Sequence, residues 1–127
     1  MIAGILKETG KENRVALLPG EAAALKKLGL DLMVEHGAGE RAYATDSEYQ
    51  AAGASPSGRA EILARADLLL CINPPVNDDI SAFRAGQILC TVLDPVENRD
   101  WLEKIRQRGV TLLALDLVPR ITRAQSM

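Results

Sequence analysis

The sequence predicts an α/β fold with a doubly wound, mostly parallel sheet of about five strands and flanking helices. Short apolar runs alternate along the chain with segments of helical periodicity, which is the pattern of successive βαβ units. Several runs are continuously apolar, as expected for strands that are buried on both faces. The 127 residues suffice for one such domain, of the Rossmann-like or flavodoxin-like kind.

The apolar runs give the expected strands, at residues 2–6, 30–35, 67–72, 87–93 and 110–115. The third run contains Leu68-Leu69-Leu70-Cys71-Ile72, which favours a fully buried parallel strand. Residues 54–58 read Ala-Ser-Pro-Ser-Gly and are expected to form a flexible surface connection. No internal repeat or low-complexity segment suggests a second domain.

Helical periodicity gives the expected helices, at residues 20–28, 46–52, 57–65, 78–83 and 99–108. Thr45 or Asp46 is the expected N-cap of the second helix, because their side chains accept hydrogen bonds from exposed backbone N–H groups. Gly29, Gly53 and Gly109 follow three of these segments and are suited to end a helix.

Composition excludes several classes of function. The formal net charge of −2 gives no broad cationic surface, so nucleic acid is not an expected partner. Cys71 and Cys90 lie in apolar runs without the spacing of a metal site, so we expect buried thiols in a reducing compartment and no metal. The N-terminal run has no signal-peptide pattern, and no apolar stretch approaches the roughly 20 residues that span a bilayer. We therefore expect a cytoplasmic chain without direct membrane insertion.

Polar residues follow each expected strand, and ligands of parallel sheets bind beyond the carboxyl ends of the strands. These residues are Lys7, Glu8 and Arg14, then His36, Asn73, Asp94, Asp116 and Arg120. Arg14 stands out because a planar guanidinium can clamp a carboxylate or a carboxamide. A surface ion pair is the alternative interpretation of this residue. The single histidine, His36, lacks catalytic partners in the pattern and is expected to be a loop or packing residue.

Residues 37–42 read Gly-Ala-Gly-Glu-Arg-Ala and fit the G-x-G-x-x-A dinucleotide fingerprint. The fingerprint requires a helix that starts within the glycine turn and an acidic residue at the end of the next strand. Here the next helix is expected to begin at Thr45 or Asp46, and Glu61 lies in a helical segment. We therefore interpret the segment as a plain turn and expect the domain to lack the glycine-rich fingerprint.

Several motifs together resemble the N-terminal domain of the alanine dehydrogenase and pyridine nucleotide transhydrogenase family. They are GILKE at 4–8, ENRVA at 12–16, EHGAG at 35–39, ADLLL at 66–70 and NPP at 73–75. The ending PRITRAQSM at 119–127 resembles the segment that leads out of the first domain of the α subunit of proton-translocating NAD(P) transhydrogenase. Leu6 and Leu18 depart from the family pattern, which usually has proline and then serine or threonine at these positions.

The resemblance implies which residues serve the nicotinamide. Alanine dehydrogenases place a lysine after the third strand and a histidine after the fourth, and the corresponding residues here are Asn73 and Asp94. Transhydrogenases need neither, because hydride passes directly between NAD(H) and NADP(H). The resemblance implies Arg120 and Gln125 as catalytic and cofactor-binding residues, with Arg14 as a further cofactor-binding residue.

The resemblance also implies how the chain is used. Residues 1–127 would form the N-terminal, nicotinamide-side domain, and the second, dinucleotide-binding domain is absent from the chain. We expect NAD(H) as the cofactor of the complete protein, weak or no binding by this chain, and no activity of the chain alone. Expected partners are the dinucleotide-binding domain of the same subunit, the NADP-binding and membrane subunits, and a second copy in a homodimer, which would place the protein peripheral to the inner membrane.

Two alternatives remain open. The chain could be a domain of an alanine dehydrogenase-type or saccharopine dehydrogenase-type amino-acid oxidoreductase. It could also be a non-enzymatic binding domain, because a fold does not fix a function.

Overall fold

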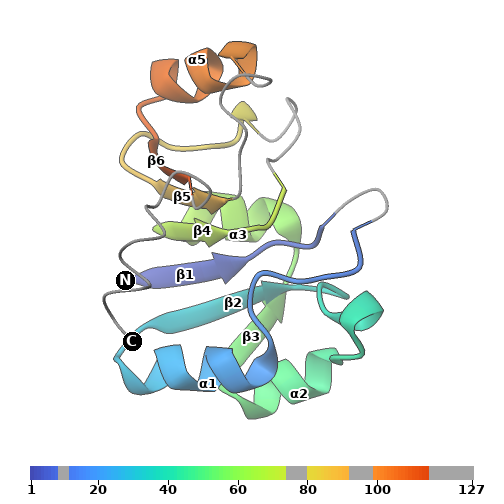
Figure 1. Ribbon diagram of the computed structural model, residues 1–127. Coiled ribbons are helices and arrows are strands. Elements are labelled where there is room, and N and C mark those ends of the chain that lie inside the picture. Colours follow the sequence, from blue (N-terminus) through green and yellow to red (C-terminus); the bar gives the residue numbers. More distant parts are fainter. Residues whose placement is uncertain (9–11, 74–79, 92–98, 115–127) are drawn as a thin grey trace, which may run out of the picture.

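A computed structural model of the protein describes residues 1–8, 12–73, 80–91 and 99–114 (Figure 1). The strands are β1 (Ile2–Ile5), β2 (Asp31–Glu35), β3 (Ala54–Ser57), β4 (Leu68–Leu70), β5 (Ile88–Thr91) and β6 (Thr111–Ala114). The helices are α1 (Pro19–Lys27), α2 (Asp46–Ala51), α3 (Arg59–Arg65) and α5 (Arg99–Gln107), with a short 3-10 helix, η1, at Glu40–Ala42.

The strands form one sheet in the order β3-β2-β1-β4-β5-β6, and every neighbouring pair is parallel. This is the strand order of Rossmann-like folds, in which the winding direction of the chain changes between two central strands. Here the change falls between β1 and β4, whose register runs from Ala3 opposite Leu68 to Ile5 opposite Leu70. The predicted α/β, doubly wound, parallel architecture is confirmed.

The strand β3 was not predicted. Residues 54–57 were expected to belong to a surface connection, but they pair with β2 from Leu32 opposite Ala54 to Glu35 opposite Ser57. A proline is tolerated here because β3 is an edge strand. The described residues therefore form a sheet of six strands, where about five were expected.

The helices cover the sheet on both faces. Successive side chains of each strand point to opposite faces, so the core consists of two clusters. In β1, Ala3 and Ile5 belong to one core cluster with residues of α1 and α2, including Ala22 and Tyr49. Leu69 of β4 belongs to the other cluster, which contains Ile62 and Leu63 of α3 and Trp101 and Ile105 of α5. In Figure 1, α1 and α2 lie along the β2 and β3 side of the sheet, and α5 lies at the β6 end. None of the described helices is long and apolar enough to cross a membrane.

The segment after β2 contains the 3-10 turn η1, which was not predicted, and the next α-helix, α2, begins where it was predicted. Thr45 caps α2: its Oγ1 accepts from Glu48 N at 3.2 Å, and Glu48 Oε1 accepts from Thr45 N at 3.0 Å. Gly37 has a positive φ of 74°, and Gly39 is buried where a Cβ would lie 2.7 Å from a ring carbon of Tyr49. These glycines serve a turn and its packing. The expected helix at 78–83 lies partly outside the described residues.

Candidate functional site

The candidate site lies at the carboxyl ends of β1 and β4, where the winding direction changes and where doubly wound sheets bind ligands. Glu8 follows β1 and turns its carboxylate toward the loop after β4. Its Oε2 accepts from Ile72 N at 2.6 Å, and its Oε1 accepts from Asn73 N at 2.9 Å. Only 8% of Glu8 is exposed, so a buried carboxylate joins the two strand ends.

Side-chain hydrogen bonds join Glu12 to Arg14 and to Asn73, which lies in the loop after β4. Arg14 donates from Nε to Glu12 Oε1 at 2.8 Å and from Nη2 to Glu12 Oε2 at 3.0 Å. Asn73 Nδ2 also donates to Glu12 Oε2, at 3.2 Å. We refer to Glu8, Glu12, Arg14 and Asn73 as the switch-point cluster.

The two side chains of this ion pair, Arg14 and Glu12, differ in their exposure to solvent. The side chain of Arg14 is 73% exposed, whereas that of Glu12 is 15% exposed. Hydrogen bonds from the Arg14 side chain and then its backbone lower the pKa of Glu12 to about 2, and Glu12 raises the pKa of Arg14. Both groups are therefore charged at neutral pH. Because arginine carries five N–H donors, the donors that Glu12 does not use can bind an oxygen of a ligand.

A second network holds the backbone beside the cluster. Glu35, at the end of β2, accepts from Lys7 N at 2.9 Å and from Arg59 Nη1 at 2.7 Å. Arg59 Nη1 also donates to the carbonyl oxygen of Lys7 at 3.2 Å. This network ties the end of β1 to the end of β2 and to the first turn of α3, so the carboxyl end of β1 is fixed on both sides.

The structure brings together only part of the set of polar residues predicted from the sequence. Glu8, Arg14 and Asn73 lie in the switch-point cluster. His36 does not: its side chain is 65% exposed, and Nδ1 lies 3.5 Å from Asp46 Oδ2. Four predicted residues lie outside the described part of the chain: Asp94, Asp116, Arg120 and Gln125.

The sequence interpretation did not assign a role to Glu12, Glu35 or Arg59. For Glu12 a signal was available, because it stands two positions before Arg14, where a glutamate can meet both nitrogens of the guanidinium. Glu35 and Arg59 are 24 positions apart in the chain, and only the sheet register brings them together. Local spacing could not have revealed that pair.

The cysteines and the described acidic residues give no sign of a metal centre. Cys71 is buried beside β5, and burial raises its pKa to about 12, which makes its thiol a poor nucleophile and a poor ligand. Burial also raises the pKa of Cys90. Within the described ranges, no group of three or more histidine, cysteine, aspartate or glutamate residues could hold a metal ion.

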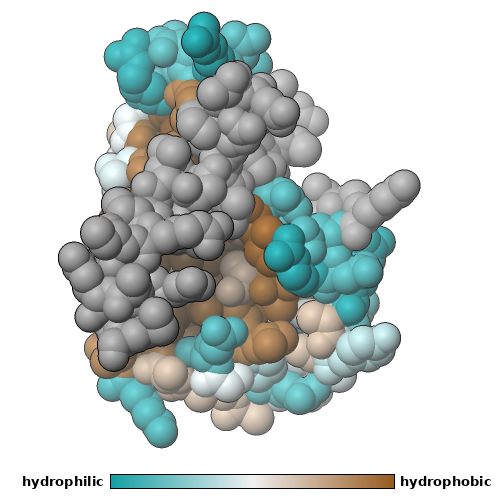
Figure 2. All heavy atoms as spheres, in the orientation of Figure 1, coloured by the Kyte–Doolittle hydropathy of each residue, from teal (hydrophilic) through white to brown (hydrophobic). Residues whose placement is uncertain are grey.

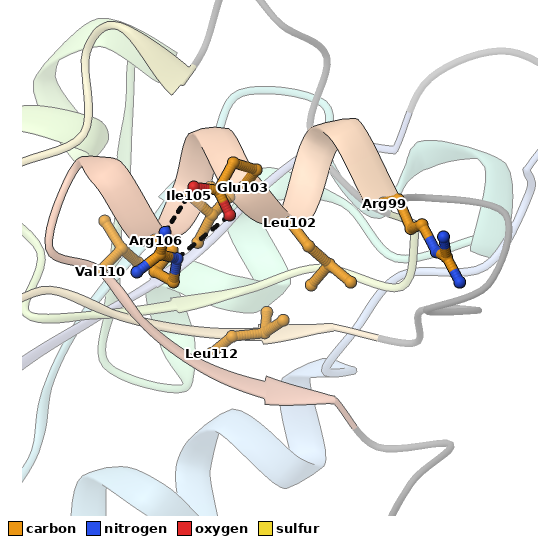
Figure 3. A pocket seen from close by; sticks show the side chains of 7 residues that line it. All are labelled: Arg99, Leu102, Glu103, Ile105, Arg106, Val110 and Leu112. Atoms are coloured by element: carbon orange, nitrogen blue, oxygen red, sulfur yellow. Dashed lines mark hydrogen bonds and ion pairs between the residues drawn. The ribbon is translucent and has the colours of Figure 1, made fainter.

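A groove lies between α5 and β6 (Figure 3). It measures about 440 Å³ and is lined by Arg99, Leu102, Glu103, Ile105, Arg106, Val110 and Leu112. Hydrophilic residues cover α5 at the top of Figure 2, and Arg106 forms an ion pair with Glu103, three positions before it on the same helix. None of the switch-point residues lines this groove, so it belongs to the packing of α5 on the edge strand.

Comparison with known proteins places the chain in a family. Residues 4–127 match the family described as "Alanine dehydrogenase/PNT, N-terminal domain". The chain is 39% identical over 118 residues to the NAD(P) transhydrogenase subunit alpha of Cereibacter sphaeroides, covering 91% of this chain and 22% of that protein. It is 37% identical over 120 residues to the alanine dehydrogenase of Mycobacterium tuberculosis, covering 93% of this chain and 32% of that protein.

A solved structure agrees with these sequence matches. The crystal structure of transhydrogenase from Sinorhizobium meliloti superposes with a TM-score of 0.92 at 38% identity, covering all of this chain and 37% of that one. The chain thus spans roughly a fifth to a third of the length of the curated relatives it matches. The resemblance inferred from the sequence motifs is confirmed, and the chain belongs to the family of the N-terminal domain of alanine dehydrogenase and pyridine nucleotide transhydrogenase.

Proposed function

We propose that this chain is the nicotinamide-side N-terminal domain of an NAD(P) transhydrogenase α subunit. In this role it would contribute to hydride transfer between NAD(H) and NADP(H), coupled to proton translocation by membrane partners. The position of the switch-point cluster supports the proposal, because the carboxyl edge of the sheet at a change of winding direction is where such folds bind nucleotides.

The observation that carries the proposal is the side chain at position 73. The family resemblance implies a lysine here in alanine dehydrogenases, where a cation and a histidine would serve the amino-acid chemistry. Asn73 instead presents a neutral amide that donates to Glu12 at 3.2 Å. A neutral side chain cannot polarise a keto acid as a cation does, but it can fix a ligand by hydrogen bonds.

The switch-point cluster suits a nicotinamide ring with its carboxamide. When bound, NAD(H) supplies or accepts the hydride, and the protein contributes position and exclusion of water. Arg14 would donate to the carboxamide oxygen from N–H groups that Glu12 does not use. Asn73 would offer its amide oxygen as an acceptor, and Glu8 would hold the loop that carries Asn73.

The remaining components of the proposed site come from outside the described residues. Arg120 and Gln125 would hold the nicotinamide from the segment after β6, as the family resemblance implies. A dinucleotide-binding domain of the same subunit would hold the adenine half of NAD. The NADP-binding and membrane subunits would complete the enzyme, with the α subunit as a homodimer peripheral to the inner membrane, and this chain would be inactive by itself.

The test is an activity comparison in a full-length protein. This chain would replace the matching segment of the NAD(P) transhydrogenase subunit alpha of Cereibacter sphaeroides, to which it is 39% identical over 118 residues. We expect hydride transfer from NADH to an NADP analogue when the other transhydrogenase subunits are added. Reduction of NAD by alanine is measured in parallel.

Alanine-dependent reduction of NAD without transfer to the NADP analogue would reject the proposal in favour of an alanine dehydrogenase-type domain. The 37% identity to an alanine dehydrogenase makes that comparison necessary. Absence of both activities in a chimera that folds and binds its partner subunits would favour a non-enzymatic binding domain.

A further inference from the structure

We propose that Glu12 sets the charge preference of the switch-point cluster, so that the site takes a neutral carboxamide rather than a carboxylate. This inference rests on the proposed function and adds a specificity-determining residue to it.

The guanidinium of Arg14 is paired before any ligand arrives. Its Nε and Nη2 meet the two oxygens of Glu12 at 2.8 Å and 3.0 Å, which is the bidentate geometry that a ligand carboxylate would otherwise adopt. The Glu12 side chain is only 15% exposed, with Asn73 Nδ2 bound to the same Oε2. A ligand therefore meets an arginine whose preferred carboxylate-binding edge is occupied.

The surrounding charges also disfavour a ligand carboxylate at Arg14. Glu8 acts on Arg14 electrostatically in addition to Glu12, so two carboxylates face one guanidinium. Asn73 adds hydrogen-bonding groups but no charge, where a lysine would have supplied a second cation. An incoming carboxylate would be repelled by this balance and would have to displace Glu12 to gain a bidentate contact.

A carboxamide is not repelled by the two carboxylates, and it does not have to displace Glu12 from Arg14. Its oxygen accepts from the remaining N–H groups of Arg14, and its NH₂ group donates to the side-chain oxygen of Asn73 or to Glu12. No existing hydrogen bond is broken, and no like charges are brought together. The cluster thus discriminates between two groups of nearly the same shape by their charge and by the hydrogen bonds that they can donate.

The experiment uses two dinucleotides that differ only in this group: NAD, with a carboxamide, and nicotinic acid adenine dinucleotide, with a carboxylate. Their dissociation constants are measured by titration calorimetry on the full-length protein that carries this chain. We expect the unmodified protein to prefer NAD by at least about tenfold, because an added unfavourable charge contact is commonly of this size. Glu12→Gln should reduce the preference by about tenfold, mainly by tightening the carboxylate analogue.

Asn73→Lys is a second variant, which adds a cation instead of removing an anion and should shift the preference in the same direction. Glu103→Gln is the matched control, because Glu103 forms the same kind of bidentate pair with Arg106 on α5, away from the cluster. It should leave the preference unchanged.

The outcomes separate the two proposals. If both Glu12→Gln and Asn73→Lys bind NAD yet keep the original preference, Glu12 does not select the ligand, while the proposed function stands. An equal loss of both dinucleotides in Glu12→Gln would also reject the inference, since Glu12 would then only support the loop. If the unmodified protein lacks hydride transfer and binds neither dinucleotide, the proposed function itself fails.

Discussion

Glu8 and Glu12 both lie between β1 and α1 in the chain, yet their carboxylates contact different kinds of partner. Glu8 is buried and accepts from two backbone N–H groups of the loop after β4. Glu12 accepts from the side chains of Arg14 and Asn73. The first contact fixes the distance between two strand ends, and in the proposed site the second sets the charge that a ligand would meet. The two residues should therefore respond differently to substitution.

Glu8→Gln should lower the free energy of unfolding by about 1–3 kcal/mol, because one amide oxygen cannot replace two carboxylate oxygens at buried donors. The amide NH₂ would face a backbone N–H and leave it without an acceptor. Urea unfolding of the chain followed by circular dichroism measures the change. Glu103→Gln, at an exposed pair on α5, is the control and should change stability by less than about 0.5 kcal/mol. Equal effects of the two substitutions would contradict a structural role for Glu8.

The Glu12 carboxylate should titrate near pH 2. Its pKa is lowered from 4.5 to about 2, chiefly by the Arg14 side chain, so the stabilisation it gives is present above pH 4.5 and is lost as the pH falls through about 2. Carbon-detected NMR of the glutamate carboxyl resonances gives the midpoint directly. In Arg14→Ala the midpoint should move back toward 4.5. A midpoint above 4 in the unmodified chain would show that the pair does not form in solution.

For single residues, the sequence predicts which residue types lie at the carboxyl edge of the sheet, but not their hydrogen-bond partners. Glu8 and Asn73 were expected there because both follow buried apolar runs. That Glu8 bonds the backbone of the Asn73 loop depends on the β1 and β4 register, which no local pattern contains. Arg14 was left between a ligand clamp and an ion pair. The structure shows the ion pair, in which Glu12 accepts from Nε and Nη2 of Arg14.

The helices α1 and α2 differ in how completely their N-terminal residues are capped by side-chain hydrogen bonds. α2 begins with Thr45, whose hydroxyl and Glu48 satisfy each other's backbone groups. α1 begins after Leu18, which has the extended backbone of an N-cap but no side-chain acceptor. At that position only Glu21 contributes, by accepting from Leu18 N at 3.1 Å. The first turn of α1 thus has half of a capping box.

Leu18→Ser should stabilise the chain by about 1 kcal/mol, because a hydroxyl at the N-cap can accept from a free N–H of the first turn. The loss of apolar contact is small, since Leu18 is 44% exposed. Thermal and urea unfolding measure the gain. Leu28→Ser, at a C-cap residue that is 78% exposed, is the control and should bring no such gain. A destabilised Leu18→Ser chain would mean that Leu18 packs against another surface.

Gly39→Ala tests the interpretation of the glycine segment as packing. An added Cβ would lie 2.7 Å from a ring carbon of Tyr49 and 2.9 Å from the carbonyl oxygen of Ala44, so the turn or α2 must shift. We expect a loss of about 1–3 kcal/mol in the free energy of unfolding. Gly58→Ala, where no atom lies within 4 Å of the added Cβ, should be nearly neutral. A neutral Gly39→Ala would remove the packing explanation.

Element prediction succeeded where apolar periodicity was strong and failed where it was absent. Leu69 and its neighbours in β4 gave a clear strand, whereas β3 buries only Ala54 and Ser57 and includes Pro56. Such a strand is specified by its pairing with β2 rather than by its own sequence. The residue propensities at 54–57 therefore indicated a loop, but these residues form a strand because they pair with β2.

In the proposed function, the whole molecule supplies one half of a ligand-binding arrangement. The sheet, six strands in the described residues, is covered on both faces, and the switch-point cluster lies at the carboxyl ends of the central strands β1 and β4. The matched relatives are several times longer than this chain. In the proposed function, the cluster meets only the nicotinamide end of the dinucleotide, while the adenine end is held elsewhere. The affinity of this chain alone for NADH follows from that division.

The isolated 127-residue chain should bind NADH at least about 100-fold more weakly than the full-length protein. The reason is that Gly37 and Gly39 are committed to a turn packed on Tyr49, and the helix that follows this turn, η1, is a single 3-10 turn. A longer helix would be needed there to bind a pyrophosphate at its N-terminus. Titration calorimetry of both proteins with NADH gives the two dissociation constants, after circular dichroism has shown that the chain is folded. Equal affinities would contradict the division of the ligand between two domains, and the turn at residues 37–39 would then be the first place to look for a complete dinucleotide site.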